Sequence, residues 1–147
     1  MRAVPIIATS LLLVACGGPV GGPEQQLRQW IADAEAAAEE KDRRKLLSLV
    51  SEHYIDARGN DIDEIDRMLR FYFLRQQTVN LATVVDDIVV SGETAADIRV
   101  TIGSMGLDQS SIGFDADAYK FHFELENNGD EWLLMGARWA RLGDELR

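Results

Sequence analysis

Apolar side chains recur at helical spacing in three segments of the first half of the chain. The pattern predicts a helix over about residues 24–41, a short helix from Asp42, and a third helix from Asp61 or Asp63 to Gln77. Asp42 can cap the second helix, because its carboxylate can accept hydrogen bonds from the free N–H groups of the first turn. The apolar positions of the first and third helices are Leu27, Trp30, Ile31, Ala34 and Ala38, and Ile62, Ile65, Met68, Leu69, Tyr72 and Phe73.

The third helix also carries an aromatic residue outside its apolar arc. Phe71 points to the opposite side of this helix. It therefore either packs on another part of the fold or leaves an aromatic ring exposed.

After Gln77 the apolar positions alternate, which is typical of β-strands. One face of a long first strand is expected to carry Val79, Leu81, Thr83, Val85, Asp87 and Val89, and the other Ala82, Val84, Ile88 and Val90. Because both faces are partly apolar, this strand is expected to be covered on both sides or bent. Asp86 and Asp87 favour a β-bulge or an exposed edge over a buried catalytic base.

Turn residues divide the rest of the chain. Residues 91–93 predict a hairpin turn, and alternation resumes from Ala96 to Ile102. Residues 103–117 are rich in Gly, Ser and Asp and are expected to form a long loop that contacts the core through Met105, Leu107, Ile112 and Phe114.

The two final strands flank the strongest turn signal in the chain, residues 127–130. The strand over residues 118–126 alternates cleanly, and the last strand is expected over about residues 131–142. The inward side chains of the former are expected to be Tyr119, Phe121, Phe123 and Leu125. Helices followed by strands predict an α+β fold, with three N-terminal helices packed on one face of a curved antiparallel sheet of about four strands.

The N-terminus differs in character from this domain. Arg2 precedes an apolar run over residues 4–13, which is too short to span a bilayer because that takes about 20 residues. The run ends in Leu13-Val14-Ala15-Cys16, which resembles the lipobox of bacterial lipoproteins. The resemblance implies a signal peptide over residues 1–15, cleavage between Ala15 and Cys16, and lipid on Cys16. The alternative is an ordinary secretory signal followed by a free thiol, a liability in an exported protein.

A spacer is expected to follow the lipidated residue. Residues 16–23 are dense in Gly and Pro, which cannot sustain a helix or strand, so the domain is expected over residues 24–147. Gly17 stands where an Asp would, in enteric bacteria, signal retention in the inner membrane. That resemblance implies anchoring to the outer membrane, on its periplasmic face.

Composition narrows the function classes. A chain of 147 residues is long enough for one domain with its own core. Its formal charge of -10 argues against nucleic acid as a partner and against electrostatic docking on anionic lipid, since both need clustered Lys and Arg. We interpret the acidity as a source of solubility.

Nearly the whole domain, residues 25–142, resembles the nuclear transport factor 2-like family. The resemblance rests on the run Tyr54-Ile55-Asp56-Ala57-Arg58-Gly59, on the residues Ile65, Leu69, Phe71, Tyr72 and Phe73 that follow, and on Trp132, Leu133 and Trp139 in the closing hairpin. It implies a cone, in which a strongly curved sheet wraps a long helix and leaves a pocket at the open end. The family includes ketosteroid isomerases, polyketide cyclases, dehydratases and domains without catalysis, so the fold alone does not decide function.

A pocket of this kind is expected to be lined by Tyr54, Asp56, Tyr72, Phe121, Trp132 and Arg138. One interpretation of Tyr54 and Asp56 is a pocket donor and an acid; the favoured interpretation is an aromatic core edge and a turn-stabilising carboxylate. Arg138 is expected to pair with an acid across the sheet rather than orient an anionic ligand. No residue maps onto a family catalytic dyad, so no catalytic residue is assigned.

Metal and cofactor sites are not expected. A metal site would need His53, His122 and a carboxylate in one place, and the spacing of the two histidines gives no support for that. The chain has no Gly-rich phosphate loop and no nucleophile–His–Asp spacing.

Three functions remain open at this point. The favoured hypothesis is a non-catalytic envelope lipoprotein that binds a protein partner or a small apolar ligand. The alternative is an isomerase-, dehydratase- or cyclase-like enzyme with a polar pair in the pocket. The third is a homodimer that pairs through the outer face of the sheet, as the family resemblance implies.

Overall fold

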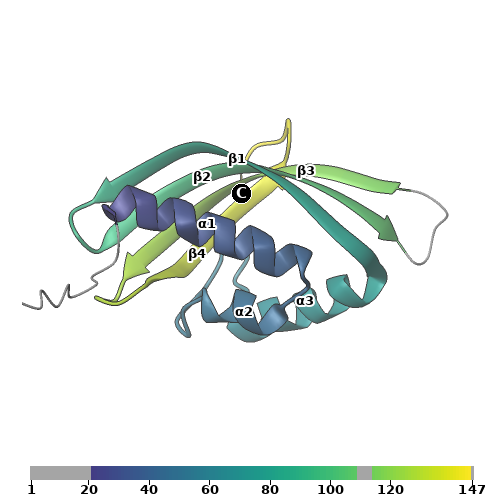
Figure 1. Ribbon diagram of the computed structural model, residues 1–147, viewed down its shortest axis with the longest axis horizontal. Helices are drawn as coiled ribbons and strands as arrows, with labels where there is room; N and C mark the ends of the chain where they lie inside the picture. The colour runs from purple at the N-terminus through teal and green to yellow at the C-terminus, as the bar shows by residue number, and fades with distance from the viewer. Residues whose placement is uncertain (1–20, 109–113, 147) are drawn as a thin grey trace, which may run out of the picture.

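The computed structural model describes residues 21–108 and 114–146, and for residues 104–108 and 114–117 it describes the backbone alone. Within this part, three helices lie on one face of a four-stranded antiparallel sheet (Figure 1). The structure is therefore α+β, as expected. The predicted signal peptide, its cleavage site at Ala15 and the lipidated Cys16 lie outside the described residues.

Helix α1 spans Pro23–Glu39 and crosses beneath the sheet (Figure 1). Pro23, which the sequence placed in the spacer, is its first residue, because a proline has no N–H to leave unsatisfied there. The helix ends before Lys41, whose positive φ of 55° is incompatible with continued helix. The ammonium of Lys41 donates hydrogen bonds to the carbonyl oxygens of Phe73 (3.5 Å), Gln76 (3.0 Å) and Gln77 (3.4 Å).

The other two helices begin at aspartate caps. Helix α2, Arg43–Ser48, is capped by Asp42, which accepts from the N–H of Lys45, as predicted. Helix α3, Ile62–Arg75, is capped by Asp61, which accepts from the N–H of Glu64. It ends two residues earlier than expected, because Gln76 already has extended backbone and starts a strand.

Asp66 connects these two helices. Its carboxylate pairs with Arg43 of α2 and with Arg70 one turn further along α3. The hydrogen bond from Arg43 lowers the pKa of Asp66 below its usual range.

The sheet is a meander in the order β1-β2-β3-β4. Its strands are β1 (Gln76–Ser91), β2 (Ala95–Asp108), β3 (Phe114–Asn127) and β4 (Trp132–Arg141). The predicted long loop over residues 103–117 is wrong, because Gly103 pairs with Ala118 and the ladder continues to Leu107 and Phe114. Gly and Ser can join a ladder because the hydrogen bonds use main-chain groups alone. Ile112 lies outside the described residues.

A β-bulge lies in the middle of β1. The register shifts between Val85 and Asp87, so the aspartate pair coincides with a bulge, as favoured above. Beyond the bulge, the residues expected on the core face lie on the solvent face, and the reverse. Val85 and Ile88 both pack towards the core, whereas Val89, which the simple alternation placed beside Val85, is 45% exposed.

The two aspartates at the bulge have partners on β2. Asp86 accepts from the hydroxyl of Thr101 at 2.9 Å, and Asp87 pairs with Arg99 at 3.1 Å. Neither is a buried base.

The sheet arches over α1 but does not curl strongly around it (Figure 1). The expectation of a strongly curved cone is therefore corrected. The described ladders contain few irregularities, in β1 and between Glu124 and Leu125 of β3, and bulges of this kind are what bend a strand sharply.

The segment that follows α2 covers the free edge of β4. The N–H groups of Ser51, Ile55 and Ala57 donate to the carbonyls of Leu134, Met135 and Ala137. These bonds satisfy an edge that would otherwise be open to another chain.

The core lies between α1 and the inner face of the sheet. Its buried members are Leu27, Trp30, Ile31, Ala96, Ile98, Val100, Leu125 and Trp132. Trp30 meets Phe123 edge to face, with ring centroids 5.9 Å apart. None of the described helices is long and apolar enough to cross a membrane.

Candidate functional site

A cavity of about 410 Å³ lies between α1, α2, α3 and the inner face of the sheet. Its walls are almost entirely apolar, and aromatic rings from β3 and β4 form one side. Lining residues from the helices include Trp30, Ile31, Ala34, Ala38, Leu46, Ile65, Met68, Leu69 and Tyr72, and those from the strands include Leu81, Val100, Ile102, Phe121, Phe123, Leu134 and Trp139. Of the predicted pocket residues, Tyr54, Tyr72 and Phe121 line it.

Tyr54 is the most deeply placed polar residue of this wall. It is 3% exposed, and among the described residues its hydroxyl has no hydrogen-bond partner. Burial, with a smaller contribution from the nearby charge of Asp56, raises the pKa of Tyr54 far above its usual range. The side chain is therefore a neutral phenol that can donate a hydrogen bond to a molecule in the cavity.

Trp30 lines the same wall with its ring. Its indole Nε1 is buried and has no hydrogen-bond partner within the part of the chain that the structure describes. A buried donor without a partner costs roughly 1–3 kcal/mol.

Glu35 is the carboxylate of this cavity. It lies on α1 between the lining residues Ala34 and Ala38 and is half-buried. The described residues supply it with neither an ion pair nor a hydrogen bond. Sequence reasoning missed Glu35, although its position four residues after Ile31 placed it beside the apolar stripe.

Aromatic rings separate the cavity from a more polar cleft. Phe121 and Trp139 stack with centroids 6.3 Å apart and line both spaces. On the far side, the guanidinium of Arg58 lies 4.3 Å from the ring centre of Trp139, a cation–π contact.

Asp56 does not line the cavity. Its carboxylate accepts hydrogen bonds from the N–H groups of Arg58 (2.8 Å) and Asn60 (2.9 Å) and from the side-chain amide of Asn60 (2.9 Å). It is 5% exposed. Asp56 therefore closes the turn that carries Gly59, which is the role favoured above over an acid in the pocket.

Trp132 and Arg138 lie outside the cavity as well. Trp132 is part of the core, and its indole N–H donates to Gln26 at 3.1 Å. Arg138 pairs with Glu124 at 2.7 Å on the outer face, the cross-strand pairing expected for it.

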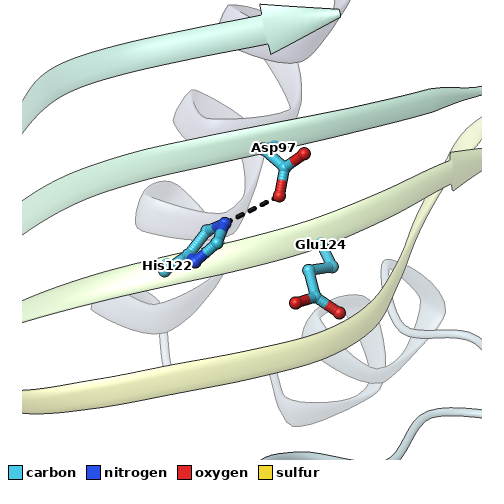
Figure 2. Close-up of side chains that lie close together, drawn as sticks. All are labelled: Asp97, His122 and Glu124. Atoms are coloured by element: carbon cyan, nitrogen blue, oxygen red, sulfur yellow. Dashed lines mark hydrogen bonds and ion pairs between the residues drawn. The ribbon is translucent and has the colours of Figure 1, made fainter. Parts of the chain in front are cut away.

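The two histidines also lie away from the cavity. His53 is exposed next to Glu52. Figure 2 shows His122 on β3 pointing toward Asp97 on β2, at 2.7 Å, with Glu124 further along β3. The ligand atoms of His122, Asp97 and Glu124 lie within 4.8 Å of one another, a spacing that a metal ion could use. Each of these side chains already has an ionic partner, since Arg138 holds Glu124.

Neither a family model nor a curated protein matches the sequence. Solved structures do match the fold. A protein from Novosphingobium aromaticivorans described as a scytalone dehydratase superposes with a TM-score of 0.75 at 10% identity, over 81% of this chain and 83% of that one. A ketosteroid isomerase-like protein from Erwinia carotovora atroseptica gives 0.67 at 12% identity, over 80% and 95%.

A third similar structure carries the family name. A protein from Streptomyces avermitilis, described as a dehydratase of the NTF2-like family, gives a TM-score of 0.68 at 13% identity, over 81% of this chain and 96% of that one. Identities this low establish the fold and not the activity. The described domain therefore has the nuclear transport factor 2-like fold.

Proposed function

We propose that this domain binds a small, largely apolar molecule in the cavity between α1, α3 and the sheet. The observation that carries the proposal is the composition of the cavity wall, which is almost entirely apolar. A volume of about 410 Å³ lies within the usual range for small-molecule sites. Each methylene buried there contributes about 0.8 kcal/mol, and the Tyr54 hydroxyl would orient a polar atom.

Filling the cavity tests this proposal. Ala38 lines the cavity, whereas Ala36 lies on the exposed side of the same helix, so Ala38→Phe and Ala36→Phe form a matched pair. We expect the neutral fluorescent probe N-phenyl-1-naphthylamine to bind saturably to the wild type and to Ala36→Phe. Ala38→Phe should weaken binding at least tenfold. Equal binding by all three proteins, or none by the wild type, would refute the proposal.

A second candidate function is proton transfer on such a molecule. It is favoured by Glu35, a cavity carboxylate without an ionic partner, and it agrees with the dehydratase and isomerase names of the similar structures. In this reaction the Glu35 carboxylate takes a proton from the carbon next to a carbonyl. The Tyr54 hydroxyl donates a hydrogen bond to the oxygen that becomes an enolate.

Deuterium exchange would detect this chemistry without knowledge of the natural substrate. We expect the protein to accelerate exchange of the α-protons of an apolar cyclic ketone in D₂O, followed by NMR. Glu35→Gln should abolish the acceleration and keep probe binding, whereas Glu40→Gln, on the exposed end of the same helix, should change neither. No acceleration by the wild type would leave a binding protein.

We also propose that lipid on Cys16 anchors the domain in the cell envelope, at the periplasmic face of the outer membrane. The support is the sequence Leu13-Val14-Ala15-Cys16 and the residue Gly17 that follows it. Labelled palmitate should be incorporated into the wild type and not into Cys16→Ser. Gly17→Asp should move the protein to the inner-membrane fraction. Secretion of an unlabelled wild-type protein would favour an ordinary signal peptide.

A further inference from the structure

Helix α3 presents an apolar and basic surface on the side that faces away from the cavity. Phe71 is 63% exposed and Leu74 is 74% exposed, and none of the fourteen residues of α3 is buried. The two side chains are three residues apart, so they are neighbours on the helix surface. We call this pair of residues, with the arginines around it, the α3 surface.

Arginines surround the apolar pair. Arg67 lies four residues before Phe71, Arg75 four residues after it, and Arg70 four residues before Leu74. The guanidinium of Arg75 lies 5.4 Å from the centre of the Phe71 ring. Residues 67–75 contain no acidic residue, although the whole chain carries a charge of -10. The second half of α3 is therefore basic, although Asp63, Glu64 and Asp66 in its first half balance the three arginines.

These features fit a lipid interface better than a second protein. A helix that lies in a membrane interface has large apolar side chains on one face and Lys or Arg beside them, whose heads reach the phosphates. Arg67 pairs with the exposed Glu64 and Arg70 with the partly buried Asp66, but more than half of each arginine side chain stays exposed and available to headgroups.

The exposed part of the cavity wall lies beside this surface. Among the lining residues, Met68 and Tyr72 are the exposed ones, and both belong to α3. Met68 is three residues before Phe71 on the helix, so a bilayer in contact with Phe71 would lie next to this part of the wall.

We infer that the α3 surface docks the domain on an anionic phospholipid bilayer, so that apolar molecules pass between the membrane and the cavity. The inference deepens the proposed function, since the nature of the cargo rests on it. Docking itself depends on neither the cavity nor the lipid anchor.

Vesicle binding tests the inference with a chain that begins at Gly17, which carries no lipid and contains all of the described residues. We expect it to sediment with vesicles of phosphatidylglycerol and phosphatidylethanolamine and at least tenfold less with neutral phosphatidylcholine vesicles. Binding should weaken as salt increases, because screening acts on the arginines.

Substitutions separate the α3 surface from general exposure. Phe71→Asp should weaken vesicle binding at least tenfold, and Arg70→Gln severalfold. Val84→Asp is the matched control, since Val84 is 60% exposed on β1, away from α3, and it should bind as the wild type does. Circular dichroism checks that each variant is folded.

The outcomes are distinct. Equal loss in Phe71→Asp and Val84→Asp, or no preference for anionic vesicles, would overturn docking. So would light scattering that shows a dimer lost in Phe71→Asp, because a second copy would then cover the surface. N-phenyl-1-naphthylamine binding without vesicles reports on the cavity alone, so failure of the proposed function is seen separately from failure of docking.

Discussion

Tyr54 carries a buried phenol. Its raised pKa means that the folded protein strongly prefers the neutral phenol. This preference is fully present below the unfolded pKa of about 10 and is lost as the pH rises above it, because the unfolded chain releases the proton first.

We therefore predict that the free energy of unfolding falls more steeply with pH above 10 in the wild type than in Tyr54→Phe, as measured by urea denaturation at several pH values. Parallel curves for Tyr54→Phe and the wild type would show that Tyr54 ionises freely in the fold.

At the scale of elements, Lys41 joins the end of α1 to the start of β1. The carbonyl groups at the C-terminal end of α3 have no helical N–H partner, and the ammonium of Lys41 donates hydrogen bonds to them. A cation is favoured at this end of a helix. We predict that Lys41→Met lowers the free energy of unfolding by about 1–2 kcal/mol, since hydrogen bonds to a charged group are lost. Denaturant titration measures it. Lys45→Met, at an exposed position on α2, should change stability little.

Sequence patterns predicted the helices and strands in which apolar side chains recur at a regular spacing. The alternation from Tyr119 to Leu125 and the apolar stripe from Leu27 to Ala38 gave strand and helix correctly. The pattern did not predict the strand residues around Gly103, because these residues pair through main-chain hydrogen bonds and show no apolar repeat. It also failed beyond Asp86, because one extra residue in a strand reverses the faces of all that follow.

The site was harder to predict for a similar reason. Tyr54 was placed in the pocket because of its sequence context, and the structure brings it to the cavity wall. Glu35 looked like one of many acids on an exposed helix. Its place in the cavity depends on how α1 lies against α3 and the sheet, which periodicity within one helix does not contain.

At the scale of the whole molecule, the outer face of the sheet is largely charged, although Val84 and Val89 on β1 are exposed. The pairs Asp87–Arg99, His122–Asp97 and Glu124–Arg138 cross it. A homodimer through this face, which the family resemblance implies, would rest on charged contacts. We predict that such a dimer dissociates as salt rises from about 0.1 M to 1 M, where the screening length falls from about 10 Å to 3 Å. Light scattering tests this, and a dimer that resists salt would contradict it.

Helix α3 encloses one side of the cavity without burying any of its own residues. Elements with little buried surface open locally at a small free-energy cost, while the rest of the molecule stays folded. The amide hydrogens of α3 should therefore exchange with solvent deuterium much faster than those of β2 around Ile98, which is fully buried. A bound molecule would slow exchange in α3 and leave β2 unchanged. The rate at which the cavity fills and empties would then follow the opening of this one helix, independently of the global stability of the protein.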